Sequence, residues 1–152
     1  MFIDKTLEFC DATALNTGAE GTYLVGNQID LGAANQDLAI PTDDLYLVIS
    51  VDTAFDSTGG AATAQFVLAS DDAAAINTST GSRHLLTKPF TEAEAVAGAI
   101  LFVGRLPYSD AERYERYIGL LQITAGEAFT AGKVNAFLTN TPPVWKPVPD
   151  AV

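Results

Sequence analysis

Residues 45–51 read Leu-Tyr-Leu-Val-Ile-Ser-Val, and this stretch decides the fold class. Successive side chains of an extended strand point to opposite faces, so Leu45, Leu47, Ile49 and Val51 share one apolar face. The opposite face is also mostly apolar, which predicts a strand that is covered on both sides. A run of this length, rich in β-branched and aliphatic residues, is typical of a strand in the interior of a β protein.

Strand-like periodicity continues on both sides of this run. Turn-forming stretches rich in Gly, Asp, Asn and Ser separate the apolar runs. Short strands joined by such turns are typical of an all-β antiparallel sandwich or barrel. Single helical turns are also expected at 91–96, where Thr91 and Glu94 fit a capping box, and at 109–112. We expect further strands at residues 62–70, 99–106, 114–124 and 134–139, and shorter ones at 22–25, 28–31 and 83–86.

Length and charge restrict the functional classes. The chain has 152 residues, of which 48% are hydrophobic, and this suits one domain with its own core. Residues 1–72 contain twelve acids and one base, whereas residues 73–152 contain seven of each, so the first half carries the whole net charge of -11. Such a chain repels phosphate backbones and anionic lipid, so we expect neither nucleic acid nor a membrane as partner. The acidic half serves plain solubility or, alternatively, complements a basic partner.

The sequence lacks a recognisable catalytic or metal-binding motif, so we expect no enzyme activity, cofactor or metal. His84 is the only imidazole and suits a strand edge, while Cys10 suits a small buried residue. The acidic pairs Asp43-Asp44 and Asp71-Asp72 suit turns and solvated loops; calcium binding by such loops stays open, although the EF-hand spacing is absent. Arginines and tyrosines alternate over residues 105–117 with interleaved acids, which predicts a strand end with cross-strand ion pairs.

The two ends of the chain differ from its middle. We assign residues 1–140 to one sandwich domain, including a mixed apolar and acidic N-terminal segment, 1–15, that lies outside the strand pattern. Residues 141–152 form an extended proline-rich C-terminal arm that contains the only Trp of the chain. Apolar side chains outside the strand pattern suggest contacts with other chains, although the Trp could equally pack on the chain's own sandwich. The candidate interface residues are Phe2, Ile3, Leu7, Phe9, Pro142, Pro143, Val144, Trp145 and Pro147.

Five segments, in this order, resemble the small β-sandwich cement (decoration) proteins of tailed-phage capsids. They are Asp4–Ala12 (DKTLEFCDA), Ile29–Gly32 (IDLG), Leu45–Phe55 (LYLVISVDTAF), Phe66–Asp72 (FVLASDD) and Thr130–Leu138 (TAGKVNAFL). The resemblance spans nearly the whole chain to Thr139, and the proline-rich tail departs from it.

The resemblance implies a jelly-roll-like sandwich that forms homotrimers on the outer surface of the virion capsid. There each trimer would bridge neighbouring major capsid proteins and strengthen the shell. Such a protein needs interfaces and arms that reach its neighbours, and it needs no catalytic residues.

Two other functions stay open from the residues alone. One is a carbohydrate- or receptor-binding jelly-roll module, for which the tyrosines could supply a platform, although the only Trp lies in the tail. The other is a glycosidase that uses paired acids, which no base, metal or nucleophile motif supports. The tyrosines are Tyr23, Tyr46, Tyr108, Tyr114 and Tyr117.

Overall fold

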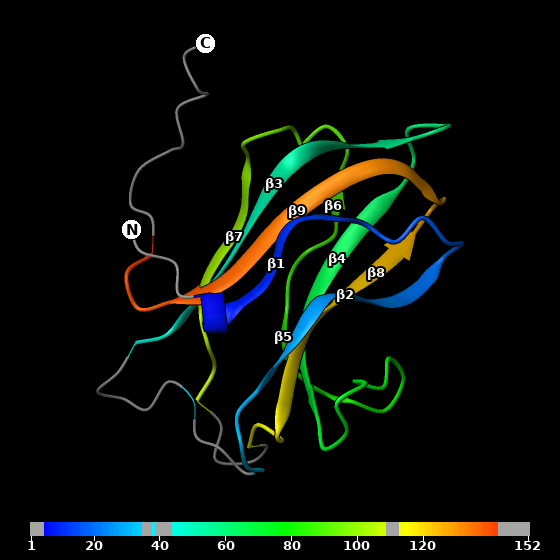
Figure 1. Ribbon diagram of the computed structural model, residues 1–152. Coiled ribbons are helices and arrows are strands. Elements are labelled where there is room, and N and C mark those ends of the chain that lie inside the picture. The colour runs from blue at the N-terminus through cyan, green and yellow to red at the C-terminus, as the bar shows by residue number, and fades with distance from the viewer. Residues whose placement is uncertain (1–4, 35–37, 39–43, 109–112, 143–152) are drawn as a thin grey trace.

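The computed structural model describes residues 5–34, 38, 44–108 and 113–142, and over these residues the chain is built almost entirely from strands (Figure 1). One short 3-10 helix, η1 (Lys5–Leu7), precedes the first strand. No helix in the described ranges is long and apolar enough to span a membrane. The strands are β1 (Glu8–Ala14), β2 (Gly21–Asp30), β3 (Tyr46–Ser57), β4 (Thr63–Asp71), β5 (Ser82–Leu86), β6 (Phe90–Thr91), β7 (Ile100–Arg105), β8 (Tyr117–Ala125) and β9 (Phe129–Thr139).

The strands form two antiparallel sheets with the topology of a jelly roll. Sheet A has the order β1-β9-β3-β7, and sheet B has the order β2-β8-β4-β5, with the two-residue β6 paired to β4. With β6 set aside, each sheet has four strands, and the chain crosses from one sheet to the other between successive strands except from β4 to β5, as in the two Greek keys of a jelly roll. The prediction of an all-β, jelly-roll-like antiparallel sandwich is therefore confirmed.

The core lies between the two sheets. Its largest fully buried side chains include Phe9 of β1, Ile49 of β3, Phe66 of β4 and Leu120 of β8. In β3, β4 and β8 the residues of this core occur at every second position. Every buried side-chain nitrogen or oxygen among the described residues has a hydrogen-bond partner. The interior therefore combines apolar packing with satisfied polar groups, which limits the desolvation cost of folding.

Each predicted strand has a counterpart in the structure, but the bounds differ: β3, β5 and β9 are longer than predicted, whereas β7 and β8 are shorter. The strands predicted at 22–25 and 28–31 are one strand, β2, whose pairing with β8 is irregular between Val25 and Ile29. The expected helical turn is a single turn after β6, where the Thr91 carbonyl accepts from the amide of Ala95 and the Glu94 carboxylate accepts from the Thr91 amide at 3.1 Å. The turn expected at 109–112 lies outside the described residues.

The N-terminal segment corrects one expectation. Its residues 8–14 are not an arm outside the strand pattern but the strand β1, paired to β9. Two register shifts interrupt this pairing, and Ala12 has a φ of 44°, so the strand does not alternate regularly. These irregularities remove the period of two by which sequence analysis finds a strand.

Candidate interaction surface

β1 begins and β9 ends at the same corner of sheet A, where η1 and the end of β9 lie side by side in Figure 1. Glu8, the first residue of β1, pairs with Phe137, and β9 ends two residues later at Thr139. The Thr139 hydroxyl accepts a hydrogen bond from the Thr141 amide at 3.1 Å, so the chain turns as soon as it leaves the sheet. Both terminal segments therefore join the sandwich at one place.

The outer face of sheet A carries an apolar row beside this corner. Val48 of β3 pairs with Val103 of β7 on one side and with Phe137 of β9 on the other. We call these three residues the sheet A patch. Val103 is 40% exposed, whereas Val48 is 2% and Phe137 5% exposed. Neither Val48 nor Phe137 belongs to the core clusters of the described residues.

Sheet B also has an apolar outer face, but the described chain covers it. Val67 and Leu121 pair across β4 and β8, and Ile76, from the loop after β4, packs against them. At the far edge of the same row, Leu86 of β5 pairs with Val67 and is 56% exposed. The two sheets therefore differ in what the described residues place over their outer faces.

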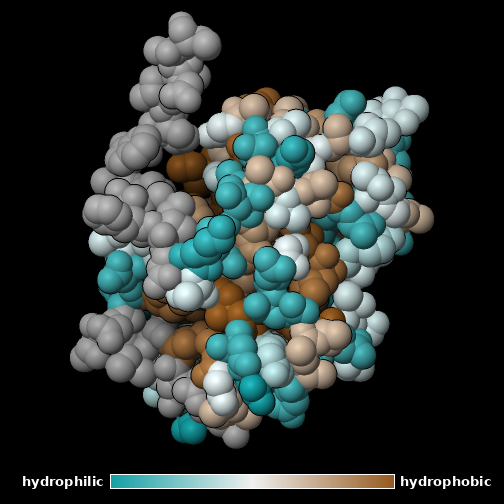
Figure 2. Space-filling view, in the orientation of Figure 1, coloured by the Kyte–Doolittle hydropathy of each residue, from teal (hydrophilic) through white to brown (hydrophobic). Residues whose placement is uncertain are grey.

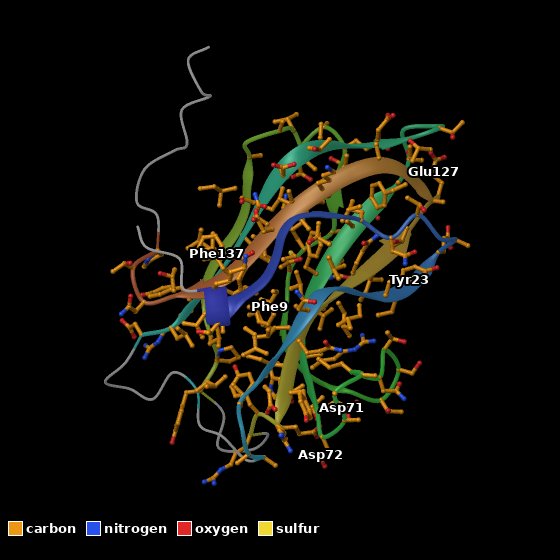
Figure 3. All side chains as sticks on the ribbon, viewed as in Figure 1. Phe9, Tyr23, Asp71, Asp72, Glu127 and Phe137 are labelled. Atoms are coloured by element: carbon orange, nitrogen blue, oxygen red, sulfur yellow. The ribbon has the colours of Figure 1, made fainter. Side chains whose placement is uncertain are left out.

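Of the nine candidate interface residues, the structure describes three. Leu7 in η1 is half-buried against the core, and Pro142 is half-buried beyond the end of β9. Phe9 is 0% exposed and lies in the core, so its side chain packs inside the sandwich rather than contacting another chain. Figure 3 shows Phe9 and Phe137 on opposite sides of sheet A. The other six, Phe2, Ile3, Pro143, Val144, Trp145 and Pro147, lie outside the described residues.

A family model, Bbp16, matches residues 9–138 of the chain. The chain belongs to the Bbp16 family. No curated protein matches it. The Bbp16 match runs from the second residue of β1 to the penultimate residue of β9, so it coincides with the sandwich. The terminal segments, with all candidate interface residues except Phe9, lie outside the matched range.

Ser70, His84 and Tyr114 of this Bbp16 sandwich form one connected group of contacts. Ser70 Oγ lies 2.7 Å from His84 Nε2 and accepts the Glu115 amide at 3.1 Å, while the His84 ring stacks on Tyr114 at a centroid distance of 4.1 Å. Ser70 is completely buried, so a substrate cannot reach its hydroxyl. Burial also raises the pKa of the Tyr114 hydroxyl, which donates to the Pro107 carbonyl. The arrangement ties β4, β5 and the segment before β8 together.

The acidic pairs serve loops and ion pairs, as their sequence contexts suggested. Asp71 accepts the amides of Ala73 at 3.0 Å and Asn77 at 2.8 Å, and these bonds hold the pKa of its carboxyl below the usual range. Asp44 pairs with Arg105 at 2.8 Å, whereas Asp43 lies outside the described residues. Among the residues with described positions, no three His, Cys, Asp or Glu side chains come together as a metal site.

The predicted cross-strand ion pair is confirmed at the start of β8. Arg116 donates from Nε and Nη2 to the two oxygens of the Asp30 carboxylate, each at 2.9 Å, and these bonds lower the pKa of Asp30. Arg83, Arg105 and Arg113 lie at the same end of the sandwich as Arg116, because β5 and β8 begin there and β7 ends there. The opposite end contains Glu127, whose carboxylate accepts the Gly59 amide. The arginines at the first end are accompanied by acids such as Asp30 and Asp44, with which Arg116 and Arg105 pair.

Three of the five tyrosines considered for a carbohydrate platform, Tyr23, Tyr114 and Tyr117, do not lie together on one exposed surface. Tyr23 lies toward one end of β2, and Tyr117 pairs with Asp30 at the other end, about 23 Å away at roughly 3.3 Å per residue. Tyr114 is buried against His84. The feature that sequence reasoning missed is instead the sheet A patch, although the apolar second face of residues 45–51 already indicated a cover on that side.

Proposed function

We propose that this protein is a structural cement protein of a phage capsid, with no catalytic step. It binds the outer surface of the shell as a homotrimer and bridges neighbouring major capsid proteins. Its place is the virion. Three features support the proposal: the jelly-roll fold, the resemblance of five ordered segments to cement proteins, and the Bbp16 family name, which hints at a bacteriophage origin.

The observation that carries the proposal is the common corner of the two terminal segments. Because β1 begins where β9 ends, the chain enters and leaves the sandwich at one corner, beside the sheet A patch. We propose that apolar side chains of both terminal segments contact one neighbour from there. The proposed contacts use Phe2, Ile3, Leu7, Pro142, Pro143, Val144 and Pro147, and Trp145 either joins them or packs on the chain's own sandwich.

Repetition by symmetry makes weak contacts of this kind sufficient. Once one arm of a trimer is bound, the second and third contacts become intramolecular, and avidity can exceed the affinity of one contact by about 10²–10⁴. Proline-rich arms also lose little conformational entropy on binding, because their backbone is already restricted.

The proposal is tested first by solution mass. Light scattering over a dilution series should give about 48 kDa, three times the 16.0 kDa of the chain. Co-sedimentation with shells of the major capsid protein should then show binding to the outer surface. A monomer at all concentrations that also fails to sediment with shells would refute the proposal.

The role of the C-terminal arm is tested by deleting residues 143–152, a change that keeps the turn at Thr139–Thr141. The sandwich should stay folded, because the core residues precede the deletion, while trimer or shell binding weakens. Unchanged assembly would exclude the arm from the mechanism. If the acidic first half faces a basic capsid surface, shell binding should also weaken as salt rises, because salt screens exposed charges.

A further inference from the structure

The starting observation is a difference between the outer faces of the two sheets. On sheet B, Val67 is buried because Ile76, Leu24 and Leu121 pack around it. On sheet A, Val48 and Phe137 are buried to a similar degree but belong to no cluster of described residues. A Val in the middle of an uncovered sheet face would retain substantial exposure. The sheet A patch therefore needs a cover from elsewhere in the protein.

We propose that the sheet A patch binds the C-terminal segment of the same chain, residues 143–152, with Trp145 as its anchor. The inference goes beyond the capsid function and does not rest on it, because the contact forms within one isolated chain. When the segment is docked in this way, its outward side is already ordered for a partner.

The length of the segment fits the distance to be crossed. Its ten residues span about 31 Å in a polyproline conformation at roughly 3.1 Å per residue. Sheet A has four strands, and three spacings of about 4.8 Å make it about 14 Å wide. The described chain ends at Pro142, just beyond the turn at Thr139–Thr141 and only five residues after Phe137. The segment therefore starts beside the patch and is long enough to cross it.

The tether favours the chain's own segment over that of a neighbouring copy. A short linker holds the segment near the patch at an effective concentration on the order of millimolar. The N-terminal residues 1–4 are a weaker candidate: they precede η1 at the β1 edge and span only about 13 Å. A Trp side chain alone buries about 150–250 Å², which is enough to cover the apolar row.

The composition of the segment also matches the surface. It reads Pro-Val-Trp-Lys-Pro-Val-Pro-Asp-Ala-Val, with one acid and one base, so docking it on an apolar row buries little charge. Figure 2 shows polar side chains beside apolar ones on the side of the molecule drawn there.

Because Trp145 is the only Trp, its fluorescence reports on the segment directly. In the native full-length chain we expect blue-shifted emission and several-fold weaker acrylamide quenching than in the urea-unfolded chain. The substitution Val103→Asp, at an exposed position within the patch, should move quenching most of the way to the unfolded value. Leu86→Asp is the matched control, because Leu86 is an exposed apolar residue on an edge strand of the other sheet. Far-UV circular dichroism confirms that both variants are folded.

Two deletions identify the occupant. Removing residues 143–152 should increase binding of an apolar dye such as ANS, whereas removing residues 1–4 should not. Emission should be independent of protein concentration, because the contact is intramolecular. The proposal is overturned if native and unfolded quenching agree, if both Asp variants respond equally, if only the N-terminal deletion increases dye binding, or if dilution shifts the emission. None of these readouts needs a trimer or a capsid, so this inference and the cement function can fail separately.

Discussion

Gly26 provides a sharp test of how β1 is held against β2. Its φ is +73°, and a Cβ added there would lie 2.1 Å from the Phe9 carbonyl oxygen and 2.7 Å from the Cys10 Cβ. Both neighbours belong to β1, whose backbone cannot yield without disturbing its pairing with β9. Gly26→Ala therefore forces the two sheets apart at the strand that leads from the N-terminal segment.

Gly32→Ala is the matched control. Gly32 has a similar φ of +81°, but a Cβ there meets nothing within 4 Å. In both variants the positive φ lowers the free energy of unfolding by about 1–2 kcal/mol. The smaller conformational freedom of the unfolded Ala chain raises it by about 0.4–1 kcal/mol in both. Overpacking adds about 1–3 kcal/mol only at Gly26, so we expect Gly26→Ala to lower the free energy of unfolding by that much more than Gly32→Ala.

Urea unfolding measures both free energies, and the comparison holds where the two variants have the same dependence on urea. Equal losses in the two variants would refute the reasoning, since they would show that the close approach of β1 and β2 contributes nothing. A loss in Gly26→Ala that matches the predicted excess would establish that β1 is a fixed part of the sandwich.

Three further predictions follow from the interior and the carboxylates. Burial raises the pKa of the Cys10 thiol to about 12 from 9.0, so alkylation at pH 8 should be on the order of a thousandfold slower in the native than in the urea-unfolded chain; equal rates would contradict this. Gln122 is buried and bonds the Asn16 amide and carbonyl, so Gln122→Ala should cost about 1–3 kcal/mol in urea unfolding, and a loss near zero would count against it. Thermal unfolding should show that the stability falls as the pH drops below about 4.5. Four carboxyls have a pKa that is lower in the folded chain than the ordinary 3.8–4.5, so they stabilise the fold at a pH above the ordinary pKa and lose this contribution as the pH falls through the folded pKa. A melting temperature that does not change with pH in this range would contradict the prediction. These carboxyls are Asp30, Asp71, Glu94 and Glu127.

The sequence was sufficient to place strands near residues 45–51 and 62–70, where β3 and β4 lie. The predicted shared face of Leu45, Leu47, Ile49 and Val51 is the one that packs in the core. The length of β3 was underestimated, because it continues to Ser57 through polar, exposed positions that pairing with β9 stabilises. Strand partners could not be predicted, since pairs such as Glu8 and Phe137 are far apart in the chain and only the folded topology joins them.

The interface residues were harder to predict for a related reason. Phe9 was assigned to an interface because it lay outside any regular pattern, but the pattern was hidden by bulges in β1 rather than absent. The sheet A patch had a visible origin in the apolar second face of residues 45–51. Its extent was not visible, because it depends on the registers that place Val103 and Phe137 beside Val48.

The outer faces of the two sheets differ in what covers their apolar residues. On sheet B, Ile76 from the loop after β4 packs over Val67 and Leu121, so residues of the same chain cover this part of the face. Sheet A has its apolar row next to the corner where both terminal segments leave the sandwich. A contact made on the sheet A side can therefore combine the patch with the proline-rich segment, whereas on the sheet B strands the most exposed large apolar residue that the structure describes is the edge residue Leu86. For this reason Val103→Asp and Leu86→Asp, which change two exposed apolar residues by the same chemistry, should also differ in shell binding, with the larger loss for Val103→Asp.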